Sequence, residues 1–293
     1  MTSETFNTPD ELLITNSLNG DRKSLEALIT RYSGLVYNLS FKMVMNKEDA
    51  ADIAQEAFIK MITKLDTFKY NSSFQTWLYR IVVNHILNYK KSAVVKRRRS
   101  FREFGDILDS APDTEIAAGE YYEADTTLLV EETKQTCMSG MLLCLDKKHR
   151  LVFILGELLG VNDKVGGEIL DIKPENFRMI LSRSKKDLYN FMQDKCGLIN
   201  KKNPCRCAKK TKAFIQAGFV NPVSLRFADS RLKKIGEMAG EKQEALENLL
   251  YNEYRELFLQ HSFLQATDLM KSLHELLYSD QMDRILETRN NMR

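Results

Sequence analysis

The sequence contains few of the residues that interrupt helices, since only 13 glycines and 5 prolines occur among its 293 residues. Alternation of apolar and polar residues, the pattern of a half-buried strand, is nearly absent. Five unevenly spaced cysteines are too few for the disulfide framework of a small secreted domain, which favours a reducing, cytoplasmic setting. The N-terminus lacks a signal-peptide pattern and no apolar run is long enough to cross a bilayer, so no membrane partner is expected.

Long amphipathic patterns are what the sequence does contain, and they predict an all-α fold. A chain of this length usually forms two or three domains. The formal net charge is only +3, from 43 basic and 40 acidic residues, yet the two kinds are segregated along the chain. No nucleophile–base arrangement or phosphate-binding glycine loop is evident, so the sequence predicts a binding protein and not an enzyme.

Residues 46–65 are predicted to form a helix with one apolar and one acidic face. The apolar residues recur at three- and four-residue spacing, at Ala50, Ile53, Ala54, Ala57, Met61 and Leu65. Polar residues off that face are Asp49, Asp52, Gln55 and Glu56. An acidic, hydrogen-bonding surface of this kind is expected to bind a partner outside the domain.

A second helix is predicted to start just before Trp77, because Ser72 and Gln75 have the spacing of a capping box. The helix continues into a basic run at residues 96–99, and its polar face carries Arg80, Asn84, Asn88 and Lys91. Amide and cationic side chains donate hydrogen bonds to base edges and phosphates. We therefore expect this face to bind a polyanion, with an ordinary solvated helix face as the alternative.

Two interpretations are open for Trp77, the one tryptophan of the chain. Its helical spacing with the apolar residues that follow favours packing in the core. Together with Phe68, Tyr70 and Phe74, it also offers a stacking surface for single-stranded DNA.

The segment 103–135 reverses the sign of the charge and has few apolar anchors. This composition predicts a flexible acidic linker.

Residues 136–195 are predicted to contain a helix-turn-helix. Gly160 ends an apolar helix, and Pro174 opens another in its favoured first-turn position. The helix that begins at Pro174 is expected to enter the major groove of DNA. Its outward or flanking residues are Asn176, Arg178, Met179, Ser182 and Arg183, and Lys173 lies in the preceding turn.

Two segments resemble the extracytoplasmic-function (group 4) class of bacterial sigma factors. Region 2 of that class resembles DAADIAQEAFIKM followed by FQTWLYRIVVNHILNYKK. Region 4 resembles the helix-turn-helix, with LSRSKKDL in place of the usual L-S-R-A-R pattern. The two motifs stand in the expected order and separation, over roughly the first two-thirds of the chain. The resemblance implies a sigma factor that binds core RNA polymerase and directs promoter recognition.

The resemblance also implies roles for individual residues. The polymerase-binding set, expected to contact the clamp helices of the largest subunit, is Asp49, Asp52, Gln55 and Glu56. The set for the −10 element is Asn71, Ser72, Trp77, Arg80, Asn84, Asn88 and Lys91, and its first two members line the pocket of a flipped base. The set for the −35 element is Lys173, Asn176, Arg178, Met179, Ser182 and Arg183. Two departures from the family pattern occur, at Lys173 and Ile180.

Sigma region 2 is accordingly expected in residues 1–102, the linker in 103–135 and sigma region 4 in 136–195. A basic segment with cysteines (196–222) and a helical extension (223–293) follow. The extension carries an apolar stripe that must be buried against something. It docks on the preceding domains and masks their surfaces, dimerises, or binds a partner such as an anti-sigma protein.

Cys196, Cys205 and Cys207 lie among basic residues, which favour the thiolate form that binds metals. A structural zinc site is one interpretation, although no fourth ligand is evident within the segment. A redox-responsive thiol cluster and a basic segment with buried thiols are the alternatives. No other cofactor is expected. Two rival functions stay open, a stand-alone helix-turn-helix regulator and a metal or redox sensor centred on these cysteines.

Overall fold

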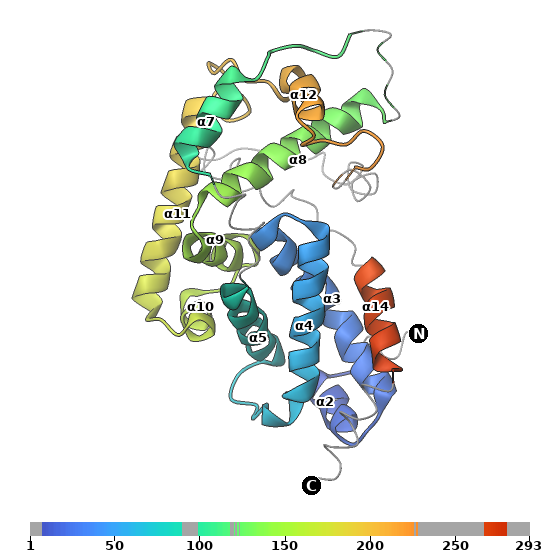
Figure 1. The fold of residues 1–293 in the computed structure, drawn as a ribbon. Helices are drawn as coiled ribbons and strands as arrows, with labels where there is room; N and C mark the ends of the chain where they lie inside the picture. The colour runs from blue at the N-terminus through green and yellow to red at the C-terminus, as the bar shows by residue number, and fades with distance from the viewer. Residues whose placement is uncertain are drawn as a thin grey trace, which may run out of the picture. The chain divides into compact units, whose positions relative to one another are not determined.

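The structure is a computed structural model that describes residues 8–89, 99–117, 124–225 and 267–279, together with residues 120, 122 and 227 (Figure 1). All the regular elements of these residues are helical, which confirms the all-α prediction. None of the described helices has both the length and the apolar character needed to cross a membrane. The chain divides into two compact units, one of Met1–Lys90, Glu168–Asp171 and Gln265–Arg293, the other of Lys91–Gly167 and Ile172–Leu264.

The first unit is a bundle of α2 (Asp10–Leu18), α3 (Arg22–Val44), α4 (Lys47–Thr63), α5 (Phe74–Asn88) and α14 (Thr267–Leu277), with a short 3-10 turn η1 (Leu65–Thr67). Side-chain caps fix where the helices begin. Asp21 accepts hydrogen bonds from the first amides of α3, and Asn46 accepts one from the amide of Asp49 in α4.

The core of the first unit lies between α3, α4 and α5. The predicted helix 46–65 ends at Thr63, and Leu65 lies in η1. The six residues of its predicted apolar face are nevertheless fully buried, each at 0% exposure: Ala50, Ile53, Ala54, Ala57, Met61 and Leu65. Leu28 and Val36 of α3 and Leu78 of α5 are equally buried. Burial of a Leu, Ile or Met side chain stabilises a fold by about 1.5–3 kcal/mol relative to exposure, so this face anchors α4 firmly.

Helix α14 lies alongside α3 and α4 (Figure 1). It buries one row of leucines at i, i+4 and i+8, namely Leu269, Leu273 and Leu277. At its end, Arg22 of α3 donates a hydrogen bond to the Leu277 carbonyl (3.3 Å). Residues 267–279 thus pack within the chain's own first unit, while the rest of the predicted apolar stripe lies outside the described residues.

The second unit contains α7 (Phe101–Ser110), α8 (Thr126–Cys144), α9 (Lys147–Phe153), the π-helical turn η2 (Ile154–Leu158), most of α10 (Asp163–Leu170), α11 (Pro174–Lys195) and α12 (Cys207–Gln216). Its core includes the fully buried Leu151, Phe153 and Leu155, together with Phe177 and Leu188 of α11.

The segment 103–135 differs from the predicted flexible linker, because it contains most of α7 and the first ten residues of α8. Ser100 and Glu103 form a reciprocal capping box at the start of α7. Phe104 and Leu108, four residues apart, are buried on one face of this helix. A Cβ added to Gly140 of α8 would come within 2.7 Å of the Phe104 ring, so α7 packs closely on α8. These apolar anchors outweigh the acidic composition.

Candidate nucleic-acid interface

Helix α4 presents its acidic side to solvent. Asp52 and Glu56 are exposed and one turn apart, with Gln55 half-buried beside them. Asp49 differs from the prediction, because it is 7% exposed and accepts a hydrogen bond from the Tyr89 hydroxyl (3.1 Å). The acidic surface of α4 therefore consists of Asp52, Gln55 and Glu56, while Asp49 joins the start of α4 to the end of α5.

The connector between α4 and α5 is accompanied by four aromatic rings. Phe68 lies at the centre, with ring centroids 4.7 Å from Tyr70 and 5.5 Å from both Phe74 and Trp77. Trp77 stacks on Phe74 (5.5 Å) and is half-buried, whereas Tyr70 is 48% exposed. The ring thus packs in an aromatic cluster, as the core interpretation predicts, and retains some exposed surface, while stacking on single-stranded DNA stays a prediction.

Ser73, and not Ser72, caps α5. Its hydroxyl oxygen accepts a hydrogen bond from the amide of Thr76 (3.1 Å), so the helix begins at Phe74. Asn71 is exposed and Ser72 half-buried, which places their polar groups in the connector next to the aromatic rings.

Helix α5 carries an exposed polar row at i, i+4 and i+8, formed by Arg80, Asn84 and Asn88. The Asn88 amide donates to the Asn84 carbonyl (2.9 Å). The exposure of these three residues agrees with the predicted polar face, and their contact with DNA stays a prediction. Lys91 lies outside the described residues.

His85 lies behind this row, half-buried against α4. Its Nδ1 is 2.6 Å from Nζ of Lys60. Burial, followed by the positive charge of Lys60, lowers the pKa of His85. The neutral ring accepts a hydrogen bond from the ammonium group and ties α5 to α4.

The second unit contains a helix-turn-helix formed by α10 and α11. The turn includes Asp171 in the left-handed region (φ 53°), and Pro174 starts α11. Lys173 precedes it without a side-chain cap, as its residue type predicts. A Cβ added to Gly166 would come within 2.3 Å of the Phe177 ring, so only glycine allows the two helices to approach this closely.

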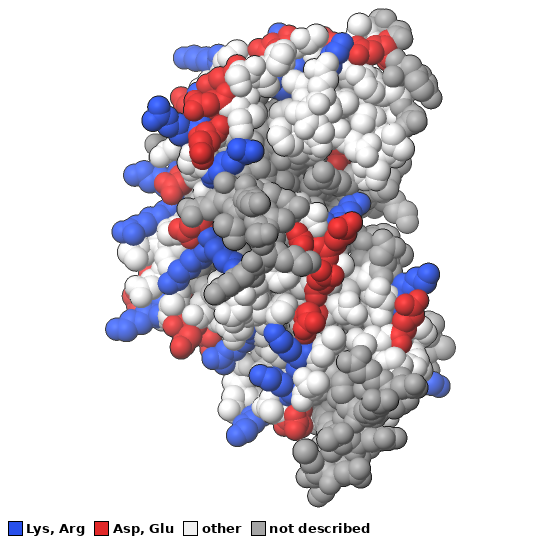
Figure 2. Space-filling view, viewed as in Figure 1, with Lys and Arg blue, Asp and Glu red and all other residues white. Residues whose placement is uncertain are grey.

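The outward face of α11 is exposed as predicted, and the opposite face is buried. Phe177, Ile180, Ser184 and Leu188 are buried. All six residues predicted to face the −35 element are exposed: Lys173, Asn176, Arg178, Met179, Ser182 and Arg183. Figure 2 shows Lys and Arg side chains projecting from the side of the molecule on which α11 lies. Arg178 forms an ion pair with Asp163, which it must exchange for any phosphate or base.

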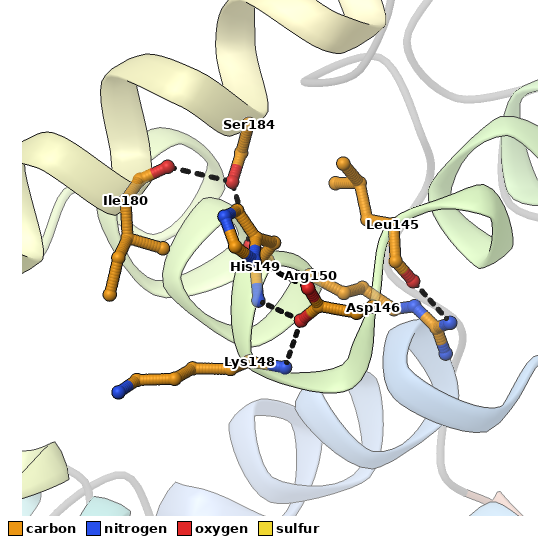
Figure 3. Close-up of polar contacts among 7 residues, drawn as sticks. All are labelled: Leu145, Asp146, Lys148, His149, Arg150, Ile180 and Ser184. Atoms are coloured by element: carbon orange, nitrogen blue, oxygen red, sulfur yellow. Dashed lines mark hydrogen bonds and ion pairs between the residues drawn. The ribbon is translucent and has the colours of Figure 1, made fainter.

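A polar network holds α9 against α8 and α11 (Figure 3). Asp146 caps α9 by accepting hydrogen bonds from the amides of Lys148 and His149 (both 2.9 Å). The Ser184 hydroxyl of α11 donates to the carbonyls of Ile180 (2.8 Å) and His149 (3.2 Å).

The buried Arg150 completes this connection by donating to the carbonyls of Leu142 (2.9 Å), Leu143 (3.0 Å) and Leu145 (2.9 Å) at the end of α8. The guanidinium satisfies carbonyls that have no partner within the helix. The exposed face of α11 is thus supported from behind by fixed polar contacts.

The end of α11 and the basic segment after it pair with the acidic segment 103–125. Ion pairs join Lys195 to Asp109 (2.7 Å), Lys210 to Asp113 (3.0 Å) and Lys212 to Glu120 (3.0 Å). The Thr114 amide also donates to the Lys209 carbonyl (3.0 Å). These lysines are neutralised within the second unit.

The three predicted cysteines come together where the chain leaves α11 and enters α12. Cys196 and Cys205 are joined by a single β-bridge, and Cys207 is the first residue of α12. In the described part of the chain, no three Cys, His, Asp or Glu side chains are positioned to hold a metal ion. Cys137 lies on α8, the helix on which α12 packs.

The described helices present an exposed acidic face, a polar row beside aromatic rings and a helix-turn-helix, which are features of a DNA-binding transcription factor. The model of sigma-70 region 2 matches residues 28–95, which cover α4, α5 and most of α3. Relatives named as sigma factors are similar to a larger part of the chain.

Two similar relatives are the sigma-E factors of Escherichia coli (strain K12) and Salmonella typhimurium (strain LT2), which are named as extracytoplasmic-function factors. Each is 30% identical to this chain over 185 residues, which cover 63% of this chain and 94% of the relative. The sigma-H factor of Pseudomonas aeruginosa is 31% identical over 131 residues, 44% of this chain and 61% of the relative. The solved structure of CnrH, in complex with the cytosolic domain of CnrY, has a TM-score of 0.44 and 15% identity, covering 63% of this chain and 97% of CnrH.

The chain belongs to the extracytoplasmic-function family of RNA polymerase sigma factors. It is a factor for promoter recognition and transcription initiation. Sigma factors are not enzymes, since the polymerase performs the chemistry. They work in the cytoplasm with core RNA polymerase and promoter DNA.

Proposed function

We propose that the acidic surface of α4 is the polymerase-binding surface of this sigma factor. Asp52 and Glu56 carry the charge, Gln55 adds hydrogen-bonding groups, and the clamp helices of the largest polymerase subunit are the partner. The observation that supports this proposal is that two exposed carboxylates lie one turn apart on a helix whose opposite face is fully buried. A charged surface on a rigid helix gives fast, oriented association with a basic partner.

The −10 element is assigned to the connector and the polar row of α5. Asn71 and Ser72 provide polar groups for an extruded base, and the neighbouring rings of Tyr70 and Trp77 provide stacking surface. Stacking contributes roughly 1–3 kcal/mol per base, which offsets the few kcal/mol that unstacking costs. Arg80, Asn84 and Asn88 then contact the adjacent bases and phosphates.

The −35 element is assigned to the exposed face of α11. Arg178 and Arg183 suit bidentate contacts with guanine or phosphate, and Asn176 suits adenine. Met179, 44% exposed, offers an apolar contact for a thymine methyl group.

The C-terminal helix α14 enters the proposal as part of the first unit. Asp52 and Glu56 are exposed while α14 is packed on α3 and α4, so residues 267–279 leave the proposed polymerase-binding surface open. This packing favours a role of α14 in supporting the bundle over a role in masking this surface.

The polymerase-binding proposal is tested by Asp52→Lys combined with Glu56→Lys. We expect the double variant to lose stable binding to core RNA polymerase, because two attractive charges become repulsive. The matched control is Glu11→Lys with Asp66→Lys, which makes the same charge change at exposed acids outside α4. Binding of purified chain to purified core, followed by gel filtration, measures the result.

Equal loss of binding in the control would show that net charge, not this surface, matters. Unchanged binding in the α4 variant would remove the proposal and favour the stand-alone regulator.

A further inference from the structure

Two stretches of the second unit carry charge of opposite sign. Residues 103–125 contain eight acidic and no basic residues, whereas residues 195–212, the basic stretch, contain seven basic and no acidic residues. The seven cations of the basic stretch are Lys195, Lys201, Lys202, Arg206, Lys209, Lys210 and Lys212. The set assigned to the −35 element includes none of them, so the basic stretch has no role in the proposed reading of promoters.

Residues 111–117, together with Glu120, form an acidic strap that is attached to α12. The Thr114 amide donates a hydrogen bond to the Lys209 carbonyl (3.0 Å). The Lys210 ammonium group donates one to the Ala111 carbonyl. These two contacts place the backbone of the acidic strap against the basic stretch.

Two ion pairs join the carboxylates of the acidic strap to lysines of α12. Asp113 pairs with Lys210, and Glu120 pairs with Lys212 (both 3.0 Å). The hydrogen bond from Lys212 lowers the pKa of Glu120, so this carboxylate is ionised at neutral pH. The two carboxylates therefore occupy positions beside α12 in which the phosphates of a nucleic acid would meet the same lysines.

Polar contacts, and not apolar packing, hold the acidic strap. None of residues 111–117 is buried, whereas α7 before them is anchored on α8 by the buried Phe104 and Leu108. The ion pairs are open to water, since Asp113 and Lys212 keep 44% and 27% of their side chains exposed. Ion pairs of this kind are weak and are screened by salt. The acidic strap can therefore leave α12 while α7 stays in place.

We propose that the basic stretch is a second DNA-binding surface, directed at the phosphate backbone of duplex DNA, and that the acidic strap covers it. With the strap in place, Lys210 and Lys212 are neutralised and α12 stays out of the DNA interface. When the strap leaves, each freed lysine replaces a counterion on a phosphate, which adds affinity without reading sequence. Duplex DNA is the partner because the chain acts on promoters and a run of lysines suits the continuous line of phosphates.

Neutralising the acidic strap tests the proposal. Asp113→Asn with Glu120→Gln frees the two paired lysines. The slope of log affinity against log salt concentration, for a duplex of unrelated sequence, should become steeper by about 1–2. The matched control is Asp106→Asn with Glu115→Gln, which makes the same charge change at exposed acids outside the two ion pairs. Fluorescence anisotropy measures the slopes, and a strap variant with the slope of the control would overturn the proposal.

A double-mutant cycle tests whether the gain comes from the basic stretch. In the strap variant, Lys212→Ala should reduce the slope by about 1, because the freed ammonium group contacts a phosphate. In the wild-type chain the same substitution should have much less effect, since Lys212 is paired with Glu120. Equal reductions in both backgrounds would show that the strap does not cover this lysine. Arg183→Ala tests the assignment of α11 separately, so failure of that assignment and failure of this proposal are distinguishable.

Hydrogen exchange measures release of the acidic strap directly. The Thr114 amide is protected by its bond to the Lys209 carbonyl. In the strap variant this amide should exchange faster than in the wild-type chain and in the control, while the amides of α7 keep their protection. Equally slow exchange of Thr114 in all three proteins would show that the two ion pairs do not hold the strap, and would overturn the proposal.

Discussion

The ammonium group of Lys42 is buried in α3, with 2% of the residue exposed, and burial lowers its pKa from 10.5 to about 8. The folded state therefore releases this proton at lower pH than the unfolded chain. Between pH 8 and 10.5 the unfolded chain binds more protons, so the free energy of unfolding rises with pH in that window. Below pH 8 both states are charged and the residue adds no pH dependence.

Lys42→Met is expected to remove this rise. Relative to the variant, the wild-type chain should gain up to roughly 3 kcal/mol of unfolding free energy between pH 8 and 10.5. Urea unfolding at several pH values measures the difference, and Lys23→Met, at an exposed position of the same helix, is the control. Wild-type and Lys42→Met curves that stay parallel across the window would contradict the assignment.

Single residues were predicted well where periodicity alone decides their environment. The apolar face of α4 is buried and the outward face of α11 is exposed, as the spacing of their residues indicates. Asp49 was placed wrongly because Tyr89, forty residues later, folds back to donate a hydrogen bond to it. The cap of α5 was misplaced by one residue, since Ser72 and Ser73 are both good caps and only geometry chooses between them.

At the scale of elements, α14 offers a direct test of how much the C-terminal segment contributes to the first unit. Leu273 is 1% exposed between α14 and its neighbours, so Leu273→Ala should lower the free energy of unfolding by about 2–4 kcal/mol. Met270→Ala, on the half-buried side of the same helix, should cost clearly less. Equal, small effects in urea unfolding would mean that α14 does not pack on the bundle in solution.

Helices α11 and α12 both carry basic residues, but we expect only those of α11 to bind DNA. Arg183 is exposed on α11, whereas Lys210 of α12 is 5% exposed and pairs with Asp113. Arg183→Ala should reduce the slope of log affinity against log salt concentration for duplex DNA by about 1. Lys210→Ala should leave the slope unchanged and lower the melting temperature, because the ion pair with Asp113 and the hydrogen bond to the Ala111 carbonyl are lost.

Fluorescence anisotropy with labelled duplex at several salt concentrations measures both slopes. A reduced slope for Lys210→Ala would place α12 in the DNA interface.

Helices were predicted from the sequence where apolar residues recur at helical spacing and a residue marks the start or end of the helix. Examples are α4, α5 and α11. Helix α7 was not, because its acidic residues mask the short apolar pattern of Phe101, Phe104 and Leu108. Its stability depends on packing against α8, which the local sequence does not contain. The ion pairs between the acidic and basic segments were missed for the same reason, since their partners lie far apart in the chain.

The whole molecule combines two units whose proposed roles are separable. The first unit carries the acidic surface of α4 and the polar row of α5, and the second carries the helix-turn-helix. Each interface is built on a rigid helix with a buried back face, so changing one should leave the other folded. Asp52→Lys with Glu56→Lys is accordingly expected to leave binding of duplex DNA by α11 unchanged.

Transcription in vitro with purified chain and bacterial core RNA polymerase tests the central claim most directly. Genomic DNA of the source organism serves as template, and sequencing of transcript 5′ ends maps where synthesis begins. We predict a discrete set of start sites that requires the chain and disappears with Asp52→Lys plus Glu56→Lys. Start sites identical to those of core polymerase alone would contradict the conclusion that this chain directs promoter recognition.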